Sequence, residues 1–391
     1  MIYTCICMCS MNHIQKENKE DLEKMAIQLK FDKDLFQDLY PYIEDDDITD
    51  IRWNGRALWV ESLSKGRYKT DTVLSDKFIR IFCDKIALYQ DVNFNPSEPK
   101  LQASTPTLRL HCIHPSRTGD GSYIIAIRKT PAIARINDKT ALDTHYADQF
   151  FIHLIDALIN SRRKAIVIGD VGAGKTEFLK YCAHFIPNNA PTLTVEDTLE
   201  MKLPTLYPEK DIQAIFVDDR YPTEKVIRDA LRLETRYLWL AEARGREITR
   251  IMEGASTGCT CWTTVHCEDT WQIPDRIVQM ASRESDRDSF ENDVFTFFDL
   301  GIKIAKKSTE SGVHRRVDQV CFFDRENKKN NTIVFMKNGK YTGVDFPQSF
   351  VDKFNESGYE NIIDEYKKIQ KQICRQKTRG SVSVTETEQK S

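Results

Sequence analysis

The spacing of hydrophobic and polar positions differs between the N-terminal third of the chain and the rest. Near the N-terminus, apolar residues spaced as on one helical face over 22–29 precede two strand-like runs, 48–53 and 57–61. Asn54-Gly55 separates these runs, and Asn-Gly between two such segments is a strong signal for a β-hairpin. The pattern therefore predicts a helix followed by a hairpin.

A second helix and two more strands complete this N-terminal region. Ser75 is a typical helix N-cap, and the apolar residues after it share one helical face. Strand-like runs at 108–113 and 123–128 follow. We expect a smaller mixed α/β domain at 19–129, after an N-terminal extension at 1–18.

The spacing of apolar residues changes after residue 129. Residues 130–145 lack periodicity and contain Pro, Asp, Asn and Lys, which predicts a linker. Over 146–345, short apolar runs alternate with helical stripes, the pattern of a parallel, doubly wound sheet and hence of an α/β fold. A helical segment is expected at 346–373, and the polar, aperiodic residues 374–391 predict a disordered tail.

A complete phosphate-loop motif, G-D-V-G-A-G-K-T, joins the apolar run 165–168 to an amphipathic helix. Glycines let the backbone wrap around phosphates, Lys175 reaches the β- and γ-phosphates, and the Thr176 hydroxyl ligates Mg²⁺. The alternative, a glycine-rich turn without a ligand, is disfavoured by the strand before it and the helix after it. We expect ATP or GTP with Mg²⁺ to bind the residues Gly169, Asp170, Val171, Gly172, Ala173, Gly174, Lys175, Thr176 and Glu177.

Three apolar runs after the loop end in a polar residue that suits nucleotide chemistry. These residues are Glu196, Glu242 and His266. In open α/β sheets the ligand lies at the carboxyl ends of the strands, so the three side chains are expected near it. Each alone is more typical of a helix cap or a structural residue. Their ordered recurrence favours nucleotide hydrolysis, which needs carboxylates for metal and water.

Composition excludes several function classes. A chain of 391 residues with 40% hydrophobic content is long enough for about two or three domains. The formal net charge of -3 gives no bulk attraction to nucleic acid, so direct nucleic-acid binding is not implied. No apolar run is long enough to cross a bilayer, and Met1 to Met11 lack the basic start of a signal peptide. We therefore expect a cytoplasmic protein.

Cysteine usage fits a reducing compartment. Eleven cysteines are an odd number, scattered through apparent core segments, which suits free thiols better than a disulfide framework. Metal binding is a weak alternative because no C-x-x-C pair is present. The clusters concerned are Cys5, Cys7 and Cys9, and Cys259, Cys261 and Cys267.

The order of these motifs resembles the type II/IV secretion ATPase superfamily. The phosphate loop, T-V-E-D-T-L-E, L-W-L-A-E-A-R-G-R-E and S-T-G-(5)-T-V-H look like its Walker A, Asp, Walker B and His boxes. The likeness is closest to the branch serving type IV secretion, conjugation and tight-adherence pili, and it spans about Ile43 to Asp324. It implies a RecA-like P-loop ATPase domain preceded by a mixed α/β N-terminal domain.

The resemblance also implies residue roles. Lys175 and Thr176 would hold phosphate and Mg²⁺, while Glu196 and Glu242 would handle the attacking water and the metal. His266 would couple the γ-phosphate to subunit movement. The expected catalytic set is therefore Lys175, Glu196, Glu242 and His266, with Thr176 and Glu242 as metal ligands.

Two arginines of the N-terminal domain, Arg109 and Arg128, match family arginines that approach the nucleotide. A fixed cation there can stabilise charge in the transition state. A solvated surface arginine is the alternative for both.

The family likeness further implies an ATP-hydrolysing homo-hexamer. Its partners would be inner-membrane components of a secretion, conjugation or pilus machine, with the motor peripheral at the inner face of the cell membrane. The chain departs from the pattern at Ala241, at Thr235-Arg236 and at Cys267-Glu268, which suggests a divergent member.

Other functions stay open on the same core: a P-loop nucleic-acid motor, a small-molecule kinase, or an ATP-binding switch with little turnover. A GTPase is disfavoured because the chain has no N-K-x-D guanine motif.

Overall fold

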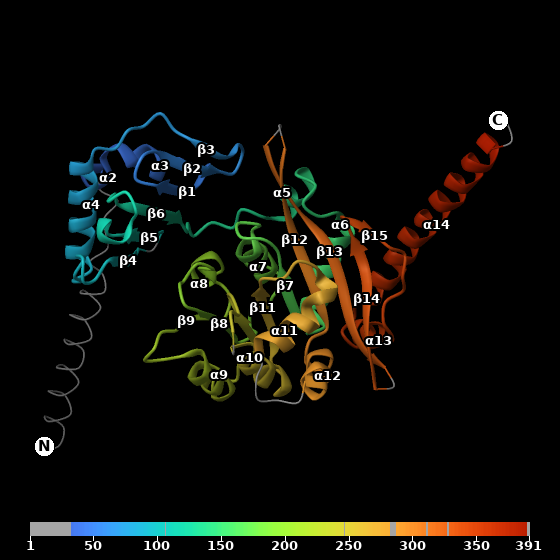
Figure 1. Cartoon of the computed structure of the whole chain (residues 1–391). Coiled ribbons are helices and arrows are strands. Elements are labelled where there is room, and N and C mark those ends of the chain that lie inside the picture. The colour runs from blue at the N-terminus through green and yellow to red at the C-terminus, as the bar shows by residue number, and fades with distance from the viewer. Residues whose placement is uncertain are drawn as a thin grey trace, which may run out of the picture. The chain divides into compact units, whose positions relative to one another are not determined.

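The computed structural model describes residues 33–105, 107–245, 247–281, 287–309, 312–326 and 328–388 (Figure 1). The chain divides into two compact units, one within Met1–Pro131 and Glu310–Val313, the other within Ala132–Thr309 and His314–Ser391. The expected extension 1–18, the helical stripe at 22–29 and the Cys5, Cys7 and Cys9 cluster lie outside the described residues.

The first unit is built on a six-stranded antiparallel sheet in the order β3-β2-β1-β6-β5-β4. Its elements are α2 Lys33–Phe36, η1 Gln37–Leu39, α3 Tyr40–Glu44, β1 Ile48–Trp53, β2 Leu58–Ser62, β3 Gly66–Lys69, α4 Asp76–Tyr89, β4 Lys100–Ser104, β5 Leu108–Ile113, η2 Pro115–Arg117 and β6 Ile124–Lys129.

Local sequence signals explain this unit well. The hairpin β1–β2 turns at Asn54, whose side-chain oxygen accepts from the backbone N–H of Arg56 and Ala57, and Gly55 has a φ of 90°. Ser75 accepts a hydrogen bond from the Phe78 N–H at 3.2 Å and so caps α4. Both expectations are confirmed.

The second unit contains a nine-stranded sheet in the order β15-β14-β13-β12-β7-β11-β10-β8-β9. The strands from β12 to β9 are parallel, and β13–β15 extend the β12 edge with antiparallel pairs of β13 with β14 and β14 with β15. Its elements are α5 Asp138–Asp143, α6 Gln149–Asn160, β7 Ala165–Ile168, α7 Lys175–Ala183, β8 Thr192–Glu196, α8 Leu203–Leu206, β9 Ile212–Phe216, α9 Thr223–Arg232, β10 Tyr237–Leu240, α10 Glu247–Ser256, β11 Thr260–Val265, η3 Thr270–Gln272, α11 Ile273–Ala281, α12 Arg287–Phe297, β12 Leu300–Thr309, β13 Gly312–Glu326, β14 Lys329–Lys337, β15 Lys340–Tyr341, α13 Gln348–Glu356 and α14 Asn361–Glu388.

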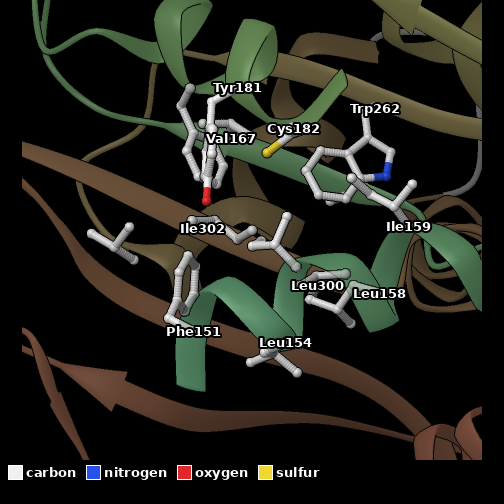
Figure 2. Close-up of a cluster of buried hydrophobic side chains, with 14 of the residues drawn as sticks. Phe151, Leu154, Leu158, Ile159, Val167, Tyr181, Cys182, Trp262, Leu300 and Ile302 are labelled. Atoms are coloured by element: carbon white, nitrogen blue, oxygen red, sulfur yellow. The ribbon is translucent and has the colours of Figure 1, made fainter. Parts of the chain in front are cut away.

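Helices cover both faces of this sheet, so the central parallel strands β7, β8, β10 and β11 are buried on two sides. Ala165 and Val167 of β7 pack into one apolar cluster with α6 and α7, while Ile166 and Ile168 pack into another with α9 to α12. Figure 2 shows the first cluster, in which side chains of α6 such as Phe151 lie beside the strands. Strands buried on both faces read as continuous apolar runs, which is why the sequence predicts them well.

The α/β fold class is confirmed, and two details differ from the expectations. The short helix α5 forms inside the segment expected to be a linker, because Asn137 and Thr140 make a reciprocal capping box. The helix α14 continues to Glu388 through the segment expected to be disordered. Among the described residues, no helix is long and apolar enough to span a membrane.

Candidate nucleotide site

The phosphate loop lies between β7, which ends at Ile168, and α7, which begins at Lys175. Its glycines have positive φ angles, 150° at Gly169, 74° at Gly172 and 98° at Gly174. A Cβ on Gly169 would lie 2.4 Å from the carbonyl oxygen of Ile304, so only glycine fits there. No side chain caps the N-terminus of α7, which leaves this end of the helix suited to an anion.

Lys175 lies folded against the loop that precedes it. Its Nζ donates to the carbonyl oxygens of Gly169 at 2.8 Å and Asp170 at 3.4 Å. The same Nζ lies 3.4 Å from Nδ1 of His266. The lysine and the histidine expected from the sequence therefore meet at the loop.

Glu242 and His266 follow the adjacent parallel strands β10 and β11, which pair in register as Leu240 with Thr263. The parallel pairing places the two side chains together, and Oε1 of Glu242 lies 3.1 Å from Nε2 of His266. The structure thus brings Lys175, His266 and Glu242 into one continuous set of contacts.

Arg244 holds the other side of the Glu242 carboxylate. Its guanidinium lies 2.9 Å from Oε2 of Glu242 and 2.9 Å from Oδ2 of Asp197. Burial raises the pKa of Glu242, but the hydrogen bond from Arg244 and the charges of Arg244, His266 and Lys175 outweigh it, so the pKa is lowered. Glu242 is therefore ionised near neutral pH.

Arg244 and Asp197 lie within the Walker B-like and Asp-box-like segments, but neither was expected to have a role in the site. The available signal was charge: Arg244 stands two residues after Glu242, and Asp197 directly follows the β8 strand. A cation so close to a strand-end carboxylate is a ready partner for it.

Glu196 has a different environment from Glu242. It is fully buried, and its Oε2 accepts from the backbone N–H of Glu200 at 2.8 Å and Met201 at 2.9 Å. Thr194 donates to its Oε1 at 3.3 Å. Burial raises its pKa despite these hydrogen bonds. Its described contacts hold the turn after β8 and do not join the set around Lys175.

The two expected arginines lie in the first unit, opposite each other on the antiparallel strands β5 and β6. Arg128 forms an ion pair with Asp50 at 2.9 Å, and Arg109 is half-buried.

The loop and its neighbours suit a magnesium nucleotide. Mg²⁺ takes few protein ligands and keeps water and phosphate oxygens, so the hydroxyl of Thr176 with the carboxylate of Glu242 is a fitting donor set. Among the described residues, no group of three or more His, Cys, Asp or Glu side chains could hold a metal ion. Cys259, Cys261 and Cys267 are free thiols.

A glycine-rich loop between a buried parallel strand and a helix, with acidic and imidazole groups at neighbouring strand ends, defines a P-loop nucleotide-binding protein. A family model described as "Type II/IV secretion system protein" matches residues 100–388. The chain therefore belongs to this family of secretion and pilus ATPases, and the resemblance drawn from the sequence boxes is confirmed.

Known proteins support the same placement. An uncharacterized protein of Bacillus anthracis is 28% identical over 264 residues, which cover 66% of this chain and 59% of that protein. The type IV secretion system protein VirB11 of Brucella suis is 24% identical over 258 residues, or 56% of this chain and 69% of VirB11. The chain thus spans less than two thirds of the Bacillus anthracis relative.

A solved structure shares the fold. The X-ray structure of the Legionella pneumophila ATPase DotB matches with a TM-score of 0.58 at 19% identity, over 86% of this chain and 88% of DotB. At this identity, the likeness establishes the architecture alone.

Proposed function

We propose that this protein is the ATP-hydrolysing motor of a type II/IV secretion-type machine that powers conjugative transfer, protein secretion or pilus assembly. The observation that carries the proposal is the meeting of Lys175, His266 and Glu242 beside the phosphate loop, through contacts of 3.4 Å and 3.1 Å. The match of the family model to residues 100–388 supports the same class of activity.

Each of these side chains has a chemical task. The ammonium of Lys175, now on the loop carbonyls, turns to the phosphate oxygens when ATP binds. Thr176 and Glu242 would hold Mg²⁺, which would supply positive charge to the phosphate groups. Glu242, kept ionised by Arg244, also orients the attacking water. His266 contacts both Lys175 and Glu242, so it transmits a change at the γ-phosphate to the rest of the domain.

Three further residues enter the proposal on the family resemblance. Glu196 acts with Glu242 on the attacking water, and its buried hydrogen bonds also hold the turn after β8. Arg109 and Arg128 would stabilise negative charge on the nucleotide, as the family resemblance implies.

The proposed assembly is a homo-hexamer at the inner face of the cell membrane, in contact with membrane components of the machine. Closure around ATP and opening after hydrolysis would drive its motion. A native mass spectrum with nucleotide tests this assembly. A strict monomer at micromolar concentration would favour a small-molecule kinase instead.

The direct test is steady-state ATP hydrolysis with and without Mg²⁺. We expect Lys175→Ala and Glu242→Gln each to reduce turnover by at least about a hundredfold, because each removes a charge from the reacting groups. Matched controls are Lys225→Ala and Glu253→Gln, whose side chains make surface contacts on α9 and α10. Near-normal turnover of Glu242→Gln would remove it from the catalytic role.

The cargo is tested in the native host. Lys175→Ala should abolish one process among conjugation, surface filaments and secretion, and that process identifies the machine. Stimulation of purified enzyme by single-stranded DNA would favour a nucleic-acid motor.

A further inference from the structure

The phosphate loop has a neighbour that none of the sequence boxes includes. The strand β12 lies beside β7 in parallel register, with Lys303 opposite Ile168 (Figure 1). The next residue, Ile304, is close enough that its carbonyl excludes any side chain at Gly169. Residues beyond Ile304 on β12, and their neighbours on β13, therefore lie along the loop itself.

Two cations of these strands approach the loop glycines. A Cβ built on Gly172 would lie 3.8 Å from Nζ of Lys306, and one on Gly174 would lie 3.6 Å from Cδ of Arg315. The Arg315 guanidinium also faces the carbonyl oxygen of Gly172, with Nε at 3.4 Å and one Nη at 3.5 Å. In the sheet, β12 and β13 lie on one side of β7, and β11, which precedes His266, lies on the other. Lys306 and Arg315 thus reach the loop from the strands on the far side of β7 from His266.

This placement has an electrostatic consequence. Lys175 already brings one positive charge to the loop, and the N-terminus of α7 adds its partial positive charge. A polyanion at the loop is attracted to each of these positive charges. Arginine is well suited to such a position because its planar fork donates several hydrogen bonds to phosphate.

We infer that Arg315 and Lys306 bind the phosphate groups of the nucleotide held by the loop, and so extend the site from the boxes onto β12 and β13. The inference rests on the proposed function, since it takes a polyphosphate as the ligand. It adds two binding residues that act through direct contact with phosphate oxygens. The reacting groups of hydrolysis stay on β10, β11 and α7.

The chain supplies closely matched controls. Arg316 follows Arg315 on β13, forms an ion pair with Asp318 at 2.7 Å and lies beside Gly339, away from the loop. Lys307 follows Lys306 on β12 and is exposed. Each control removes the same charge from the same strand one residue away, at a side chain with no described contact to the loop.

The experiment measures the affinity of the full chain for a fluorescent ATP analogue with Mg²⁺, and for inorganic tripolyphosphate by competition. We expect Arg315→Ala to weaken both about tenfold to a hundredfold, and Lys306→Ala about fivefold. Arg315→Lys should recover part of the loss, because it restores charge without the fork. Arg316→Ala and Lys307→Ala should stay within about twofold of the parent.

The outcomes separate this inference from the proposed function. If the parent chain binds the analogue and Lys175→Ala does not, but Arg315→Ala binds as the parent does, the inference is overturned and the proposed function stands. If the parent chain binds neither probe, the proposed function itself fails. Circular dichroism checks that each variant is folded, and Arg315→Gln replaces Arg315→Ala if the smaller side chain impairs folding.

Discussion

The two sheets of this chain bury their residues in different ways. In the first unit, β5 alternates between buried and half-buried positions over its six residues, as expected for an antiparallel sheet with one apolar face. In the second unit, every residue of β7, β8, β10 and β11 is buried. The antiparallel sheet can therefore have charged side chains along its strands. A charged side chain of a fully buried parallel strand avoids the free-energy cost of burial only where the strand ends.

This difference explains where the candidate chemistry lies. Glu242 and His266 stand beyond the ends of β10 and β11, where 25% and 45% of their side-chain surfaces remain exposed. Glu196, the last residue of β8, is still inside the buried region and needs backbone donors to satisfy its carboxylate. Since Val195 pairs with Leu240, Glu196 stays enclosed in the sheet, while Glu242 lies one position further along and is partly exposed.

The largest expected effect comes from tryptophans in the two sheets. Trp262 of β11 is fully buried, stacks on Trp239 and donates to the Arg163 carbonyl at 2.8 Å, whereas Trp59 of β2 is half-buried. Trp262→Ala should lower the free energy of unfolding by about 3–5 kcal/mol, and Trp59→Ala by about 1 kcal/mol. Urea unfolding followed by circular dichroism measures both.

Equal losses for the two tryptophan variants would show that the parallel sheet is no more tightly packed than the antiparallel one. The two sheets would then differ in the pairing of their strands but not in how tightly their side chains pack.

A smaller effect concerns one acid in each unit, the half-buried Asp47 and the buried Glu196, whose pKa values shift in opposite directions. The pKa of Glu196 is raised by burial, so its contribution to stability is full below the unfolded pKa of about 4.3 and is lost as the pH rises through the folded value. Burial also opposes ionisation of Asp47, but hydrogen bonds from Ser62 and Ser64 outweigh it and lower the pKa. Its contribution is present above about 3.9 and is lost as the pH falls through the folded value.

Glu196→Gln and Asp47→Asn should therefore respond to pH in opposite directions. Relative to the parent chain, Glu196→Gln should gain a few degrees in Tm as the pH rises from about 4 to 7, and Asp47→Asn should lose a few degrees as the pH rises from about 2 to 4. Calorimetric scans at several pH values measure this. Parallel slopes for the two variants would contradict the assigned environments.

The smallest effect compares two helix N-termini. The Ser75 side chain caps α4, whereas α7 has no side-chain cap and begins at the phosphate loop. Ser75→Ala should cost about 1 kcal/mol of stability through the lost cap. Nucleotide should raise the unfolding midpoint of the parent and of Ser75→Ala by the same amount, because it binds the other helix. A nucleotide effect that depends on Ser75 would contradict this separation.

Much of the fold follows from local rules and was predictable. Asn54-Gly55 marks the hairpin, Ser75 marks the start of α4, and the buried runs at 165–168 and 237–241 mark parallel strands. The ribbon β13–β15 was not predicted, although the turn between β14 and β15 is Asn338-Gly339, which is a local hairpin signal like Asn54-Gly55. The helical segment expected at 346–373 includes the first part of α14, and only the continuation of this helix beyond residue 373 was not expected.

The residues of the candidate site likewise include some that the sequence predicted and some that it did not. The loop, Lys175, Glu242 and His266 could be named because motif and strand ends are visible in one dimension. The burial of Glu196 and the pairing of Arg244 with both Glu242 and Asp197 could not, since each depends on which strands are neighbours in the sheet.

The sequence by itself determined the phosphate loop, the α/β class and the family, because glycine spacing and apolar runs act over a few residues. Only the tertiary structure decided that Glu196 is enclosed and that Arg244 pairs with both Asp197 and Glu242. It also decided that Arg315 of β13 reaches the phosphate loop. Parallel strand order brings residues more than a hundred positions apart within hydrogen-bonding distance, and no short segment carries that information.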